Sequence, residues 1–199
     1  MKKIFFILGL SITMLSCSAQ SIIPLESYTL NDLGNNNYIK DTSGILNPYI
    51  GTWRWTDTTT NSEFTVVFLI KTMYNPNNLA NYRQDKVMGS YKYIQNGNIV
   101  VDKLVFDIDN ISSPNYASII SNISSPFSKL SLNLFDFVKS KDCKGNFELI
   151  DPVTLPNGQL TSNQARWKIY DGEHWNINGT NPLPDGFSIP TDVILTKIN

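Results

Sequence analysis

Residues 87–106 read VMGSYKYIQNGNIVVDKLVF, and this stretch decides the fold. The dipeptide Asn96-Gly97 favours a two-residue type I′ turn, because both of its positions need positive φ. The residues on either side are rich in β-branched and aromatic side chains, which favour strands. We therefore predict a hairpin of two antiparallel strands, residues 87–95 and 98–106.

The same period-two pattern recurs outward from this hairpin. In residues 63–72, Phe64, Val66 and Phe68 share one face, which we interpret as a core face. Further strands are expected at residues 49–56, 129–138, 145–150, 165–170 and 193–198. Together with the hairpin these make about eight short strands.

Two segments depart from simple alternation. In residues 129–138 the apolar positions change phase after Leu134, which predicts a bulge or bend there. In residues 113–123 the isoleucines lie at near-helical spacing, which favours a short helix, with a loop as the alternative.

Many antiparallel strands with little helix indicate an all-β domain. We predict a closed antiparallel up-and-down β-barrel of about eight strands, with a β-sandwich as the alternative. Eight strands enclose enough space for packed side chains or for one small ligand.

Residues 48–53, PYIGTW, resemble the Gly-x-Trp opening of the lipocalin and calycin barrels. In those barrels the Trp closes the floor, and an Arg after the last strand accompanies it; this chain has Lys197 there instead. Residues 51–53, 89–93 and 187–197, with Trp167 and the N-terminal leader, also resemble an uncharacterised family of Bacteroidota lipoproteins, a domain of unknown function. Both resemblances imply a barrel, and neither implies a chemical activity.

The N-terminus carries the signal for cellular location. Residues 1–16 begin with two lysines and continue with an apolar run too short to span a bilayer, as in a signal peptide. Met14-Leu15-Ser16-Cys17 resembles the lipobox of bacterial lipoproteins, in which cleavage precedes a Cys that becomes the acylated N-terminus. We therefore expect Cys17 to bind the protein to membrane lipid in the bacterial cell envelope, at the outer membrane.

The alternative is an ordinary secretory leader cut after Ala19 or Gln20, which would leave a soluble secreted or periplasmic protein. With the lipobox interpretation, residues 17–47 form the lipidated Cys, a tether and an irregular lead-in. Residues 48–199 form the barrel domain.

Composition excludes several classes of function. Charged residues make up 17% of the chain, its net charge is −1 and it has no basic run, so nucleic-acid binding is not expected. One His and two Cys exclude a metal site built mainly from those ligands. No phosphate loop or dinucleotide fingerprint occurs, and we expect no cofactor.

The reactive side chains form no recognisable catalytic motif. His174 lies in an expected turn, and Cys143 lies in another turn between lysines. Asp107 and Asp109 point the same way from one expected strand. Paired carboxylates remain candidates for hydrolysis, and those that could meet across the sheet are Glu63, Asp85, Asp136 and Glu148.

Aromatic residues are more informative about function than the reactive side chains, because their rings either fill a core or line a binding pocket. The candidate ligand-binding residues are Trp53, Trp55, Tyr91, Tyr93 and Trp167. Three functions remain open. The first is non-enzymatic binding of a small apolar or glycan ligand, the second a structural or interaction lipoprotein with a filled core, and the third a carboxylate-dependent hydrolase.

Overall fold

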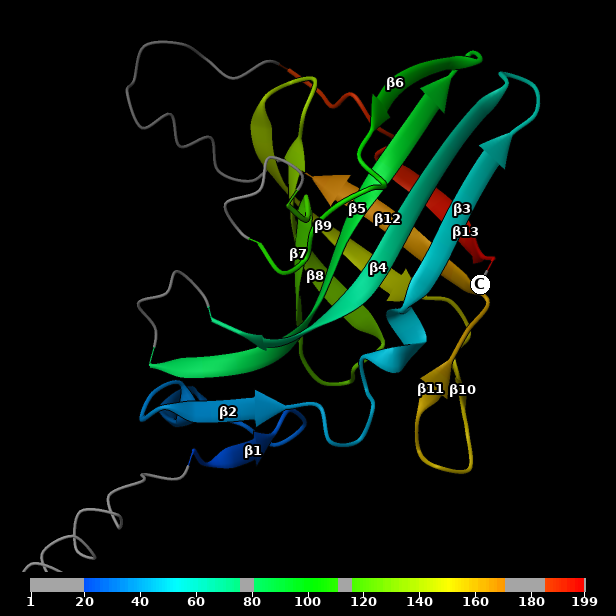
Figure 1. The fold of residues 1–199 in the computed structure, drawn as a ribbon. Helices are drawn as coiled ribbons and strands as arrows, with labels where there is room; N and C mark the ends of the chain where they lie inside the picture. Colours follow the sequence, from blue (N-terminus) through cyan, green and yellow to red (C-terminus); the bar gives the residue numbers. More distant parts are fainter. Residues whose placement is uncertain (1–19, 76–80, 111–115, 171–184, 199) are drawn as a thin grey trace, which may run out of the picture.

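The computed structural model describes residues 20–75, 81–110, 116–170 and 185–198. Within them, eight antiparallel strands close into a barrel in which β13 pairs with β3 (Figure 1). The predicted all-β fold with a closed antiparallel barrel is confirmed. The barrel strands are β3 (Gly51–Asp57), β4 (Ser62–Tyr74), β5 (Tyr82–Gln95), β7 (Ile119–Ile123), β8 (Lys129–Asp136), β9 (Lys141–Leu149), β12 (Gln164–Tyr170) and β13 (Asp192–Lys197).

The predicted hairpin forms between β5 and β6 (Asn98–Asp102). Asn96 and Gly97 have φ angles of 52° and 78°, as a type I′ turn requires. β6 is shorter than expected and lies outside the barrel wall, because it pairs only with β5. The wall continues instead through β7, whose Ile120 and Ile119 pair with Met88 and Gly89.

The predicted helix in residues 113–123 is wrong. Residues 111–115 lie outside the described part, and Ile119–Ile123 form β7 between β5 and β8. Ile119, Ser121 and Ile123 are buried in alternation, so pairing on both sides overrides the near-helical spacing of the isoleucines.

The predicted bulge near Leu134 is also wrong. β8 pairs with β9 from Lys129 to Asp136 without a shift in register. The apolar pattern changes phase because Asp136, a polar residue, takes the next inward position, while Phe135 is only partly buried.

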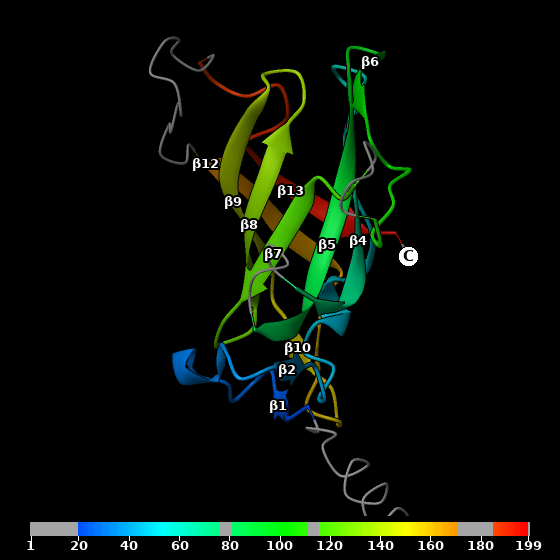
Figure 2. The ribbon, with the colours of Figure 1, turned by 60° about the vertical axis from the view of Figure 1, so that its left-hand side comes forward.

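The lead-in before the barrel is more regular than its composition indicates. It contains β1 (Ile22–Pro24), the 3-10 helix η1 (Leu30–Asp32), β2 (Asn37–Lys40) and the 3-10 helix η2 (Asn47–Tyr49). β1 and β2 pair in parallel, and β2 pairs in parallel with the first residues of β5. Figures 1 and 2 show β1, β2 and η1 beneath the barrel. Leu25, Ile39 and Leu46 belong to the barrel core, so this segment covers one end of it.

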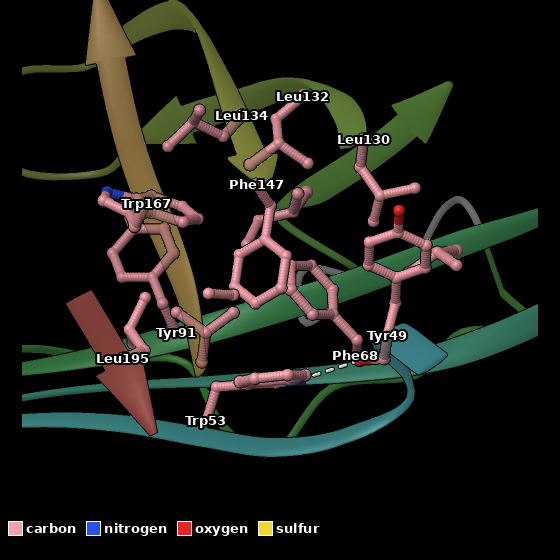
Figure 3. Packing of buried hydrophobic residues seen from close by; sticks show 14 of the residues in the cluster. Tyr49, Trp53, Phe68, Tyr91, Leu130, Leu132, Leu134, Phe147, Trp167 and Leu195 are labelled. Atoms are coloured by element: carbon pink, nitrogen blue, oxygen red, sulfur yellow. Dashed lines mark hydrogen bonds between the residues drawn. The ribbon is translucent and has the colours of Figure 1, made fainter. Parts of the chain in front are cut away.

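Aromatic rings and leucines fill the barrel interior (Figure 3). The ring of Phe147 meets those of Trp53 and Phe68 edge to face, at centroid distances of 5.0 Å and 5.1 Å. Trp167 meets Phe64 in the same way at 5.1 Å. The short hairpin of β10 (Val153–Thr154) and β11 (Leu160–Thr161) lies outside this core, between β9 and β12 in sequence.

Trp53 is fixed at the end of the barrel that the lead-in covers. Its Nε1 donates to the carbonyl oxygen of Tyr49 at 2.8 Å. Lys197, which stands where the lipocalin resemblance implies an Arg, lies over the Trp53 ring at 5.2 Å and donates to the carbonyl of Pro48 at 3.0 Å. Residues from both ends of the barrel sequence therefore meet here.

Candidate functional site

Three of the five aromatic candidates are fully enclosed in the core, and Tyr93 belongs to the same core cluster. Trp53, Tyr91 and Trp167 have no exposed surface. The Tyr91 hydroxyl donates to the carbonyl of Phe135 at 2.7 Å, and the Trp167 Nε1 donates to the carbonyl of Pro190 at 2.9 Å. Burial and hydrogen bonding to the backbone are what a packed core requires of such side chains.

The other two candidates reach the surface at different places. Tyr93 is almost buried and lines a hollow of about 330 Å³ with residues 187–191 at one mouth of the barrel. Trp55 is half-buried and lines a groove of about 920 Å³ on the outer wall. The structure therefore does not bring the five residues together in one pocket.

The groove is built by β3, β9, β12 and β13. On these strands Glu148 pairs with Arg166, and Arg166 pairs with Ile194, so the three residues form a row across the outer wall. We call the whole surface the outer groove, and its lining residues are Trp55, Glu148, Leu149, Ile150, Asp151, Arg166, Asp192, Val193 and Ile194.

Trp55 reaches this groove because the ladder between β3 and β13 is short. Only two pairs are formed, Thr196 with Arg54 and Lys197 with Trp53, although both strands continue. Trp55 lies just beyond the last pair. A residue on the core face of β3 thus lines a surface groove where the wall is not sealed by hydrogen bonds.

A bidentate ion pair lies in the outer groove. Arg166 Nε donates to Asp192 Oδ1 at 2.7 Å and Arg166 Nη2 donates to Oδ2 at 2.6 Å. The hydrogen bonds from Arg166 hold the pKa of Asp192 below its ordinary value. Asp192 and, to a smaller extent, Glu148 raise the pKa of Arg166.

The groove thus combines a fixed guanidinium with exposed carboxylates and apolar surface. Glu148 and Asp151 are exposed, and Ile194 adds an exposed aliphatic side chain beside them. Carboxylate oxygens accept hydrogen bonds from hydroxyl groups, and an indole ring offers a flat apolar face. This set of groups suits a ligand that has both hydroxyls and C–H faces.

Asp136 is buried for a structural purpose. Its Oδ1 accepts from the backbone of Val138 and Lys139 at 3.1 Å and 3.0 Å and from the Ser188 hydroxyl at 2.5 Å, and its Oδ2 accepts from the Ser188 backbone at 2.8 Å. Burial alone would raise its pKa, but these hydrogen bonds outweigh burial and lower it. Asp136 therefore fastens residues 185–191 over the barrel mouth, where Ile189 is buried.

The other carboxylates named from the sequence lie apart from one another. Asp85 accepts from the Tyr38 hydroxyl at 2.6 Å, and Glu63 lies 3.6 Å from Arg54. Of the four residues expected to meet across the sheet, only Glu148 lines the outer groove.

Two expectations about reactive residues need correction, and two lie outside the described residues. Cys143 is not in a turn, because it occupies a buried position of β9. Asp107 and Asp109 follow the end of β6, where Asp107 accepts from the Asp109 backbone at 2.8 Å and Asp109 pairs with Lys71 at 2.5 Å. His174 and Cys17 lie outside the described residues, in segments 171–184 and 1–19.

Sequence reasoning missed Arg166 and Asp192. Arg166 lies at an exposed position of the predicted strand 165–170, so alternation gave a signal that it faces outward, whereas Asp192 lies just before the predicted strand 193–198. Their contact depends on strand pairing between residues 26 positions apart, which alternation does not supply.

The described residues contain neither a cluster of metal ligands nor a membrane-spanning helix. No group of three or more His, Cys, Asp or Glu is placed to hold a metal ion. No helix in that part of the chain has both the length and the apolar character needed to cross a membrane.

Comparison with known proteins gives one match. No curated protein and no solved structure matches the chain. A family described as a family of unknown function (DUF6705) matches residues 1–198, which is nearly the whole sequence. The chain, with its barrel and outer groove, therefore belongs to the DUF6705 family.

Proposed function

We propose that this protein is a cell-envelope lipoprotein, anchored through acylated Cys17, whose calycin-like barrel binds a glycan in the outer groove without chemical conversion. The observation that carries this proposal is the groove itself, where Trp55 lies beside exposed carboxylates and the Arg166–Asp192 pair. Its size, about 920 Å³, is in the range of small-molecule sites.

The groove favours a hydroxyl-rich ligand over a purely apolar one. Glu148 and Asp151 supply acceptors, and Arg166 supplies donors held in a fixed orientation by Asp192. Trp55 supplies a ring for stacking. The described interior, by contrast, holds the apolar side chains of the core cluster.

The carboxylates of the groove support binding rather than hydrolysis. A general acid needs a pKa raised toward neutrality. The pKa of Asp192 is instead lowered by Arg166, and Arg166 also faces Glu148 across the strands.

A structural or interaction lipoprotein is the second candidate. The filled interior and the covered barrel ends favour it, because such a domain needs stability and no internal cavity. It predicts that the outer groove binds no glycan.

Titration of the full-length acylated protein with a panel of neutral and acidic oligosaccharides tests the proposal. We expect binding that quenches or shifts indole fluorescence, and at least ten-fold weaker binding in Trp55→Ala and Glu148→Gln, which is about 1.4 kcal/mol. Tyr170→Ala is the matched control, since Tyr170 is an exposed aromatic residue of β12 outside the groove lining.

Two results would overturn the proposal. Equal glycan affinity in Trp55→Ala and the wild type would place the ligand elsewhere. Absence of binding to every oligosaccharide of the panel would favour the structural or interaction lipoprotein instead. The lipid anchor at Cys17 is tested separately by mass spectrometry of the N-terminal peptide from the membrane fraction. An unmodified N-terminus at Ser21 would refute the acylated anchor.

A further inference from the structure

Two apolar side chains project from the end of the barrel covered by the lead-in. Leu30 in η1 is 83% exposed, and Ile22 in β1 is 59% exposed. Figures 1 and 2 place β1, β2 and η1 at this same end, and β6 at the opposite end. Apolar residues such as Ile99 of β6 are exposed elsewhere too, so it is the place of Leu30 and Ile22 beside the expected anchor that marks them for a contact.

The position of Leu30 is fixed rather than loose. Asp32 closes a capping box around it, because its Oδ2 accepts from the backbone of Thr29 at 2.7 Å and from the Thr29 hydroxyl at 2.8 Å. The capping box therefore holds Leu30 at a defined place, where its side chain is available for contact.

The chain between the expected anchor and the folded domain is very short. The Ser21 carbonyl already accepts from the Tyr38 backbone, and Ile22 begins the β1 ladder. Only four peptide units separate Cys17 from Ser21, a reach of at most about 14 Å. If Cys17 carries acyl chains in the bilayer, the β1–β2 end lies directly above the headgroups.

The charges at this end are of both signs. Glu26 is bonded to the Ser43 hydroxyl, and the hydrogen bond from that hydroxyl lowers the pKa of Glu26, which favours its charged form. Asp32 is held by Thr29 as described, and hydrogen bonds from neutral groups do not cancel the charge of a carboxylate. Lys40, opposite Pro24 in the ladder, is exposed and can approach lipid phosphates.

We propose that Ile22, Leu30 and Lys40 form a membrane-docking face, which holds the barrel on the bilayer surface with its β6 end pointing away. The occupant is a phospholipid surface. This inference rests on the acylation of Cys17 in the proposed function and adds an orientation to it. The apolar side chains enter the interfacial region, as in other peripheral contacts that reinforce a lipid anchor.

Photocrosslinking of the full-length acylated protein in phosphatidylethanolamine–phosphatidylglycerol vesicles tests the orientation. The photoreactive residue p-benzoylphenylalanine replaces Leu30 or Ile22, and as a matched control it replaces Ile99 of β6, which is 62% exposed at the opposite end. We expect lipid adducts at positions 30 and 22 to be at least five-fold more abundant than at position 99.

Each outcome bears on the proposal. Adducts at position 99 as abundant as at position 30, or adducts at neither 22 nor 30, would overturn the docking face. If glycan titration of the same preparation still responds to Trp55→Ala, the groove survives while the orientation fails. An unacylated Cys17 would refute both the anchor and the docking face, because the face depends on the short tether.

Discussion

Trp53 and Trp55 lie two residues apart on the same face of β3, yet they belong to different regions of the molecule. Trp53 is buried in the barrel, hydrogen-bonded to Tyr49 and covered by Lys197. Trp55 is half-buried and lines the outer groove. The difference arises where the β3–β13 ladder ends, so strand pairing rather than residue type separates core from surface here.

The sharpest test of this comparison replaces each Trp in turn. Trp53→Ala is expected to lower the free energy of unfolding by about 3–5 kcal/mol, because it removes a fully packed ring and leaves a cavity. Trp55→Ala is expected to cost about 1 kcal/mol, because its ring is already partly in water. Urea denaturation of both variants gives the values, and similar losses in the two would refute the distinction.

Gly89 tests how tightly the interior is closed. A Cβ atom there would lie 2.4 Å from the Val67 carbonyl oxygen and 2.6 Å from the Phe68 ring, so Gly89→Ala is expected to cost about 1–3 kcal/mol. Gly34 is the matched control, because nothing lies within 4 Å of its added Cβ. A melting temperature of Gly89→Ala equal to that of Gly34→Ala would show that the wall yields at this point.

Asp136 provides a test of the barrel mouth that depends on pH. Since its folded pKa is lowered, the folded protein binds fewer protons than the unfolded chain in acid. Its contribution is therefore complete above the unfolded pKa of about 3.9 and is lost as the pH falls through the folded value. Denaturation between about pH 5 and pH 2.5 is expected to show a shallower acid loss in Asp136→Asn than in the wild type. If the free energy of unfolding fell equally with pH in Asp136→Asn and in the wild type, this role of Asp136 would be contradicted.

The smallest effect on stability is expected in the outer groove. Arg166→Gln breaks an exposed ion pair, which contributes little to stability because solvent screens it. The same change should weaken glycan binding, because it removes the remaining guanidinium N–H donors, whose orientation is fixed by the bonds to Asp192. A variant that loses several kcal/mol of stability, or that binds glycan as tightly as the wild type, would contradict the assignment of Arg166 to the groove.

The fold was readable from the sequence because most strands alternate clearly. The Asn96-Gly97 turn and the buried face of Phe64, Val66 and Phe68 both have the predicted geometry. β7 escaped prediction because five residues rich in isoleucine fit a helix as well as a strand until their neighbours are known.

The candidate site was less readable. The aromatic candidates were predicted to lie either in the core or in a pocket, and alternation could not say which, since Trp53 and Trp55 share a face. The Arg166–Asp192 pair and the inward Asp136 depend on registers and on a distant segment, Ser188 in particular. Such contacts are set by the closed barrel and are not encoded in local pattern.

The short β3–β13 ladder also makes one of two weak lines in the closed wall, since the β5–β7 ladder has two residue pairs as well. Two residue pairs and the bond from the Ile198 amide to the Thr52 carbonyl join β3 and β13. Local opening is therefore expected to be easier along these two lines than in the long β4–β5 ladder, with faster amide hydrogen exchange. A ligand that contacts both Trp55 of β3 and Ile194 of β13 would hold these two strands together. Ligand binding in the outer groove would then slow local opening of the barrel.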